Sequence, residues 1–96
     1  MYRILTEQRK AAQKLGVVIR PSTLKNKKID VYKNGFKVAS IGDIRYNDYW
    51  IYKRLEKQGT VEPGTANDRR QLYKIRHNQE CQAKGTPGFY ACNILW

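Results

Sequence analysis

Residues 29–41 read Ile29-Asp30-Val31-Tyr32-Lys33-Asn34-Gly35-Phe36-Lys37-Val38-Ala39-Ser40-Ile41, a pattern typical of a β-hairpin. The dipeptide Asn34-Gly35 supplies the two positive-φ positions of a type I′ turn, whose twist matches that of the flanking strands. Apolar and polar residues alternate on both sides of the turn, so one face of the hairpin is apolar and the other is mixed. Because a lone two-stranded hairpin is marginal in water, the apolar face must pack against another element.

Two segments near the C-terminus are expected to cover this face. A helix is predicted over about residues 66–80, with Thr65 as its N-cap and Asp68 completing an approximate capping box. A short aromatic helix should start at Thr86, because Pro87 suits the first turn of a helix. The side chains expected to anchor these helices in the core are Leu72, Ile75, Phe89, Tyr90 and Trp96. The sequence therefore predicts a small α+β domain in which the hairpin packs against both helices.

The N-terminal residues are predicted to form a basic arm and connector (1–28) ahead of the compact domain (29–96). Within this arm, the thin apolar stripe of residues 5–15 indicates a short, weak helix that Thr6 could cap. Residues 17–19 are Val-Val-Ile, which indicates a short strand that could extend the hairpin into a larger sheet.

The middle of the chain is rich in aromatic side chains, with four of them in the seven positions of 46–52. Asn47 or Asp48 could cap a helix that continues to Lys57, and an irregular aromatic loop is the alternative. Residues 58–65 contain Pro-Gly and are predicted to form a surface loop.

Charge is the strongest property of the composition, since the chain carries a formal net charge of +11 and has a pI near 9.9. Residues 1–40 hold ten Lys and Arg against two acids, whereas residues 41–96 hold nine against six. Such a field implies an acidic partner, which could be nucleic acid, an anionic membrane surface or an acidic protein. A basic surface that serves only solubility is the alternative.

The two cysteines, Cys81 and Cys92, are too few for a disulfide framework. Reduced thiols are expected, and a single disulfide between the two cysteines is the alternative. With His77 they offer at most three of the four ligands that structural zinc requires. No apolar run reaches the length of a membrane span and the N-terminus lacks a signal-peptide core, so we expect the protein to act on the cytosolic side of a membrane.

Catalytic residues are not evident in this sequence. The eight acids form no pair at the spacing that a hydrolase or a metal-dependent nuclease needs, and His77 lies among cations without a nucleophile beside it. The glycines do not form a phosphate-binding loop. We therefore predict no catalytic site, no metal, no cofactor and no small-molecule substrate, and an enzyme is the weakest hypothesis.

Binding to a polyanion or an acidic partner is the stronger expectation. Cations of the predicted 66–80 helix could lie along a phosphate backbone, and Tyr46, Tyr49 and Trp50 could stack on unpaired bases. In so small a domain, however, Tyr and Trp residues often form the core, and this is the stronger interpretation of the three. The candidate binding residues are Arg20, Lys25, Lys27, Lys28, Arg69, Arg70, Lys74, Arg76 and His77.

Six short motifs occur in a characteristic order along the chain. They are Ile19-Arg20-Pro21-Ser22-Thr23, Ser40-Ile41-Gly42, Tyr46-x-Asp48-Tyr49, Arg69-Arg70-x-x-Tyr73-x-x-Arg76-His77, Thr86-x-Gly88-Phe89-Tyr90 and Ile94-Leu95-Trp96. Through these motifs, about residues 17–96 resemble a family of small basic proteins encoded by nucleocytoplasmic large DNA viruses, such as the algal and amoebal giant viruses. The resemblance implies a viral, non-enzymatic protein that is incorporated in the particle.

A minor capsid protein of the cement type is the function that we expect first from the resemblance and the charge. Its partners would be the major capsid protein or other minor capsid proteins, with DNA or the anionic inner membrane surface as further candidates. It would be located in the virion, and in the host cytoplasm during assembly. The alternative is a virion protein that binds and condenses DNA without sequence preference.

Overall fold

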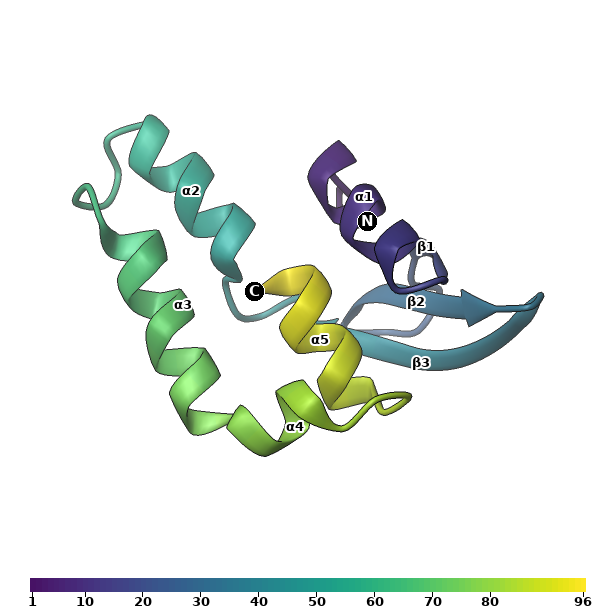
Figure 1. The fold of residues 1–96 in the computed structure, drawn as a ribbon. Helices are drawn as coiled ribbons and strands as arrows, with labels where there is room; N and C mark the ends of the chain where they lie inside the picture. Colours follow the sequence, from purple (N-terminus) through teal and green to yellow (C-terminus); the bar gives the residue numbers. More distant parts are fainter.

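The computed structural model describes residues 1–96 and has an α+β fold, as predicted, with one three-stranded antiparallel sheet and five helices. The strands, in the spatial order β1-β2-β3, are β1 (Val18–Pro21), β2 (Lys27–Lys33) and β3 (Phe36–Asp43). The helices are α1 (Thr6–Lys14), α2 (Tyr49–Lys57), α3 (Thr65–Arg76), α4 (Asn78–Gln82) and α5 (Pro87–Leu95). Helices α1 and α5 lie next to the sheet, whereas α2 leads away from it and α3 returns beside α2 (Figure 1).

The predicted hairpin is confirmed. Asn34 and Gly35 have φ values of 52° and 82°, and the strands close with Lys33 opposite Phe36. The register places Val31 opposite Ala39, and in the third strand Ile19 faces Val31 from the other side. The predicted extension of the hairpin by the segment around Ile19 is therefore also confirmed.

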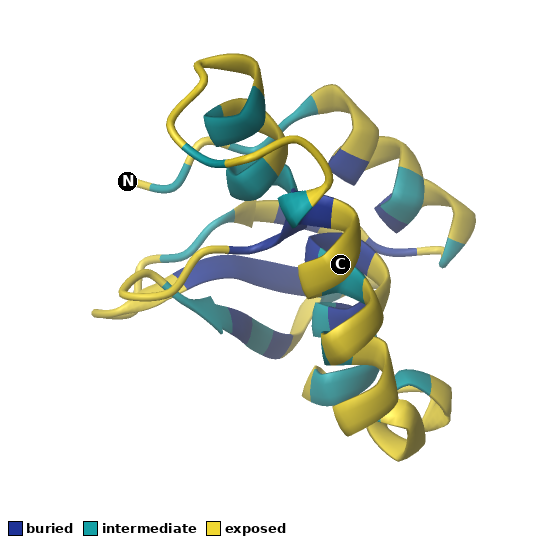
Figure 2. Ribbon diagram, turned by 90° about the vertical axis from the view of Figure 1, so that its left-hand side faces the viewer, coloured by how far each residue is buried: buried dark blue, intermediate teal, exposed yellow.

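The core lies on one face of the sheet. Ile19, Ile29, Val31 and Ile41 are at most 2% exposed, and α5 lays Leu95 on them together with Tyr90 and Ile94. Figure 2 shows the buried positions gathered in the sheet and in the segments beside it, while the outer helices are mostly exposed. Each such apolar side chain contributes about 1.5–3 kcal/mol when it is fully buried. The C-terminal helix is thus the main cover of the hairpin, as expected.

The predicted helix over 66–80 differs from α3 in its length and its partner. Helix α3 ends at Arg76, and α4 starts at Asn78 after a break at His77. It packs against α2, and α5 rather than α3 covers the hairpin.

The predicted core role of two α3 residues is wrong, because Leu72 is 43% and Ile75 is 74% exposed. The inward face of α3 instead carries the buried Ala66 and the half-buried Arg70 and Tyr73. The ring of Tyr73 stacks on Trp96, so an aromatic side chain takes the inward position that the aliphatic pattern suggested for Leu72. Of the other predicted anchors, Tyr90 is buried, and Phe89 and Trp96 are partly buried against the core.

Two predicted helix caps are replaced by neighbouring residues. Leu5 is the N-cap of α1, and its N–H donates to the side chain of Gln8, while Thr6 is the first helical residue. Gly64, with a φ of 94°, is the N-cap of α3 in place of Thr65. The orphan N–H groups of Gly64 and Ala66 donate to the two carboxylate oxygens of Glu56 on α2, at 3.1 and 3.3 Å. A side chain of α2 therefore caps α3. The predicted cap of α2 is confirmed, since the Asp48 carboxylate accepts from the N–H of Ile51.

Residues 1–28, which the sequence suggests as an arm, fold onto the rest of the chain. Ala12, Val17 and Ile19 belong to the core, and the Arg9 guanidinium donates to the carbonyl of Ile19 at 3.1 Å. Helix α1 packs against both β1 and α5. The N-terminal segment is thus a structural layer of the domain.

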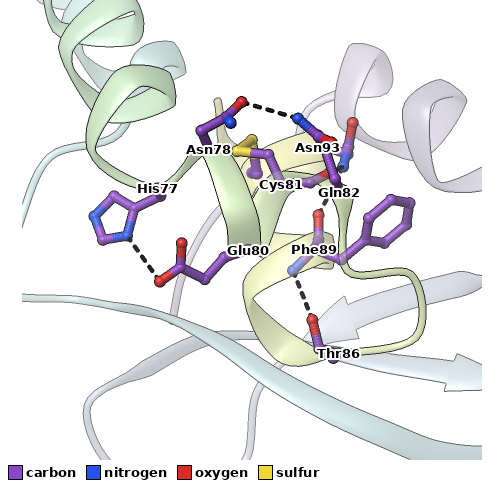
Figure 3. The surroundings of a disulfide bond; sticks show 9 residues. His77, Asn78, Glu80, Cys81, Gln82, Thr86, Phe89 and Asn93 are labelled. Atoms are coloured by element: carbon purple, nitrogen blue, oxygen red, sulfur yellow. Dashed lines mark hydrogen bonds and ion pairs between the residues drawn. A yellow bond between two sulfur atoms is a disulfide. The ribbon is translucent and has the colours of Figure 1, made fainter.

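Cys81 and Cys92 form a disulfide, so the expectation of reduced thiols is wrong. Cys81 lies on α4 and Cys92 on α5, and Figure 3 shows the bond between these two helices. The break at His77 turns the chain, so that α4 packs on α5 and the two Cα atoms come within 5.2 Å. The side chain of Asn93 adds hydrogen bonds to the carbonyls of Phe89 and Cys81. The sequence carried no sign of the turn that brings the cysteines together.

Reduction of this disulfide should destabilise the protein by about 2–3 kcal/mol, because the bond closes a short loop and restricts the unfolded chain. The measurement is urea unfolding with and without a reductant. The control is the double variant Cys81→Ser with Cys92→Ser, which the reductant should leave unchanged. Two free thiols in unreduced protein, detected by alkylation and mass spectrometry, would contradict the bond.

Gly42 marks the closest approach of β3 to the C-terminal helix. A Cβ atom at this position would lie 2.8 Å from both Leu95 Cδ1 and Lys28 Cδ, whereas one at Gly59 would have no neighbour within 4 Å. Both glycines have a positive φ, 78° and 76°, so substitution strains the backbone equally at the two sites. We expect Gly42→Ala to cost about 1–3 kcal/mol more than Gly59→Ala, which is the cost of overpacking a core. Equal losses in urea unfolding would show that the contact does not constrain the fold.

Candidate polyanion-binding surface

Six of the nine predicted binding residues are exposed, three of them on or beside the sheet and three on α3. Arg20, Lys25 and Lys27 are exposed on or beside the sheet, and the Arg20 guanidinium lies 5.2 Å from the ring centre of Tyr32. On α3, the exposed cations are Arg69, Lys74 and Arg76. These six residues can reach a partner, and the structure does not unite them in one stripe.

Two residues of the predicted α3 stripe, Arg70 and His77, pack against aromatic rings. The guanidinium carbon of Arg70 is 3.4 Å from the ring centre of Tyr49, and its Nε atom is buried without a hydrogen-bond partner. The imidazole of His77 lies against the ring of Tyr73, with 4.3 Å between the ring centres. The His77 Nδ1 atom is 3.8 Å from a carboxylate oxygen of Glu80 (Figure 3). Arg70 therefore serves packing between α2 and α3.

Lys28, the remaining candidate, is only 3% exposed and cannot reach a partner, so its predicted binding role is corrected to a structural one. Its Nζ atom donates to Asp48 at 2.9 Å and to the Tyr46 carbonyl at 2.7 Å. The same Asp48 oxygen accepts from the Tyr2 hydroxyl at 2.7 Å, and that hydroxyl accepts from Gln8 at 2.8 Å. Burial and the charge of Asp48 raise the pKa of Tyr2, so its hydroxyl stays protonated and can donate.

Asp30 is a second buried carboxylate, 1% exposed, on the face of β2 that points away from the core. Burial alone would raise its pKa. The hydroxyls of Ser22 and Ser40, at 2.6 and 2.7 Å, and the Thr23 N–H outweigh that effect, so the pKa of Asp30 lies below its usual value. Hydroxyl donors rather than a lysine or arginine partner hold this charge inside the protein.

Most of the positive charge is not neutralised within the protein. Of the 19 Lys and Arg side chains, only Lys28 and Arg45 lie within 4.0 Å of a carboxylate, which leaves 17 without one. The Arg45 side chain holds Asp43 with three hydrogen bonds, which lower the pKa of Asp43 to about 2. Such a surface attracts anions over a distance of about 10 Å at ordinary ionic strength.

A cleft of about 440 Å³ separates α3 from the end of the hairpin and from α5. Tyr73 and Trp96 stack in its wall with 4.6 Å between ring centres and 10° between ring planes, and burial raises the pKa of Tyr73. The residues of the cleft that matter below are Lys27, Asp43, Arg69, Tyr73, Arg76 and Trp96. The sequence named three of these as cation candidates and Trp96 as an anchor, but it gave no sign that they share one cleft.

The structure contains few groups of the kinds that hold a metal ion or act as a nucleophile. No group of three or more His, Cys, Asp or Glu side chains could hold a metal ion. Both cysteines are in the disulfide, so neither is a free thiol nucleophile. None of the five helices is long and apolar enough to cross a lipid bilayer.

Comparisons with protein-family models, with curated proteins and with solved structures yield no match for this chain. The functional inferences therefore rest on the geometry and on the resemblance given by the sequence motifs.

Replacing Lys28 by Met should be far more damaging than the same change at Lys25. The Lys28→Met variant leaves the Asp48 carboxylate buried without its cation, and we expect a loss of about 3–5 kcal/mol in the free energy of unfolding. Lys25→Met removes an exposed cation nearby and should change stability by about 0.5 kcal/mol or less. The measurement is urea unfolding of both variants, and similar losses would refute the structural role of Lys28.

Proposed function

We propose that this protein is a non-enzymatic nucleic-acid-binding protein that contacts the phosphate backbone of DNA without sequence preference. The observation that carries the proposal is the set of 17 Lys and Arg side chains without a carboxylate partner, on a chain of 96 residues. The cations of such a protein repel one another, and the negative charge of a bound polyanion reduces this repulsion. Binding also releases the counterions that were condensed on the polyanion, which favours the complex further. Duplex DNA carries one negative charge per about 1.7 Å of helix axis, so its phosphate backbone is a suitable polyanion.

The place of action proposed is the interior of a large DNA virus particle. It is supported by the resemblance of residues 17–96 to small basic proteins of giant viruses, through motifs such as Tyr46-x-Asp48-Tyr49. Several motif residues have structural roles that a related protein would share. Asp48 caps α2 and binds Lys28, Gly42 allows Leu95 to approach the sheet, and Thr86 caps α5. The motifs therefore support a shared fold more directly than a shared site.

A minor capsid protein is the second candidate, although the sequence alone placed it first. The observation that favours it is the exposure of apolar side chains on strands β1 and β3, where Val18, Phe36 and Val38 are 58%, 75% and 40% exposed. Such residues, with cations around them, suit contact with an acidic protein surface of the shell. The unpaired charge is the larger feature, and for this reason we favour nucleic acid over a capsid protein as the partner.

Duplex DNA should bind with an affinity that falls steeply with salt, because each phosphate contact releases counterions. Two double variants test this dependence. One replaces both Lys10 and Lys14 on α1 by glutamine, and the other replaces both Lys33 and Lys37 at the hairpin. Each should reduce the slope of log K against log salt concentration. The expected reduction is about 0.9 for each lysine that contacts a phosphate. The measurement is fluorescence anisotropy with labelled duplexes of unrelated sequence.

The control is Asp43→Asn with Arg45→Gln, which removes an exposed ion pair and leaves the net charge at +11. It should bind DNA as the unchanged protein does. Absence of binding at low salt would refute the proposal. Recovery of the protein with the shell at fixed stoichiometry, after DNA and membrane are removed from particles, would favour the capsid candidate instead.

A further inference from the structure

The cleft between α3 and the hairpin combines aromatic rings with cations, and a ligand that is both planar and anionic could contact both. The rings form a column of His77, Tyr73 and Trp96, with 4.3 and 4.6 Å between successive ring centres. The cations are Lys27, Arg69 and Arg76, which line the same space. Its volume of about 440 Å³ lies within the range of small-ligand sites.

The rings are held in place from behind. Trp96 follows α5, whose Leu95 is buried in the core, and the Trp50 indole N–H donates to the Ile94 carbonyl at 3.1 Å. On the other side of the cleft, the Glu56 carboxylate fixes the start of α3. The stack of Tyr73 on Trp96 therefore joins two separately supported helices. Because Tyr73 lies between His77 and Trp96, a ligand ring can stack only on the outer face of one of these two end rings. A planar nucleobase can stack on such a ring whichever of the bases it is, because every base has a π-face.

Three cations of the cleft form no ion pair within the protein, although Asp43 lies opposite Lys27 on the neighbouring strand. The two acids in its lining are already engaged, Asp43 by Arg45 and Asp48 by Lys28. Lys27, Arg69 and Arg76 have no carboxylate within 4.0 Å. Arg69 is further placed by the ring of Tyr52, 5.7 Å from its guanidinium carbon. Their uncompensated charge suits an anion, and arginine side chains are well matched to phosphate.

We propose that this cleft binds a nucleotide, with the base stacked against the aromatic column and the phosphate held by Arg69, Arg76 and Lys27. The ligand is a free nucleotide or an unpaired nucleotide within a single strand, since both present the same chemistry. In duplex DNA the bases are already stacked on one another and cannot enter. The site is therefore separate from the backbone contacts of the proposed function, and either can fail without the other.

The test compares two variants that each remove two exposed cations, so that the loss of net charge is matched. Arg69→Gln with Arg76→Gln acts in the cleft, and Lys53→Gln with Lys57→Gln acts on α2 outside it. The probes are dAMP, inorganic phosphate, a ten-residue single strand of dA and a duplex, with tryptophan fluorescence and anisotropy as readouts.

The cleft variant should weaken single-strand binding by about tenfold or more, as the loss of one stacked and charge-held nucleotide implies. The α2 variant should weaken it by about twofold or less, and both variants should bind the duplex alike. Binding of dAMP identifies a free nucleotide as a sufficient ligand, whereas binding of the strand alone identifies the unpaired nucleotide of a chain. Equal weakening by the two variants, or phosphate binding as tight as dAMP binding, would overturn the proposal.

Photochemical crosslinking gives a second measurement that needs no variant. A single strand that carries 5-iododeoxyuridine should crosslink to Trp96 or His77, the two ends of the column, because the halogenated base reacts with the ring on which it stacks. Crosslinks found only outside the cleft would refute the stacked geometry, even if the cation variants weaken binding.

Discussion

The buried ion pair between Lys28 and Asp48 is the interaction on which the arrangement of the chain depends. It joins the central strand to the start of α2, and Asp48 also receives the hydroxyl of Tyr2 from the N-terminal segment. Removing two charges from water is costly, and here the cost is offset by the hydrogen bonds that both side chains make with further partners. Such a pair has few alternative geometries, so it sets the direction in which α2 leaves the sheet.

That direction divides the molecule into two parts with different stabilisation. The sheet, α1 and α5 share a continuous apolar core. The pair α2 and α3 is held by other means, namely the Glu56 cap, the packing of Arg70 on Tyr49, and the stack of Tyr73 on Trp96. The disulfide then fixes α4 to α5. Polar and aromatic contacts thus replace aliphatic burial in the part of the protein that carries the cleft.

The sequence predicted those elements whose cause is local. Asn34-Gly35 specifies its turn by backbone conformation, and the caps Asp48 and Thr86 lie within three residues of the N–H groups they accept from. It failed where the cause is a partner distant in sequence. In the sequence Lys28 does not differ from the exposed lysines beside it. Its buried position depends on Asp48, which lies twenty positions later in the chain. The inward side of α3 was assigned from Leu72 and Ile75, but Trp96 and Tyr49 select Tyr73 and Arg70 instead.

The same distinction applies to the candidate site. The type of residue was foreseeable, since cations and aromatics are frequent in this chain, but their grouping was not. Lys27, Arg69 and Trp96 line one cleft because α2 leads away from the sheet and α3 returns toward it. The path of the chain between two such helices produces no periodic pattern in the sequence.

The attachment of α3 at its two ends has a consequence for motion. Its start is tied to Glu56 and its far end leads into the disulfide-linked α4, whereas most of its length is exposed and only Ala66 is buried. A segment with so little apolar burial opens at a lower free energy than the sheet. Slow amide exchange should therefore be confined to the strands and α5, with α3 exchanging through local opening. Local opening of α3 would separate Tyr73 from Trp96 and so disrupt the cleft, while the core beneath it stays folded.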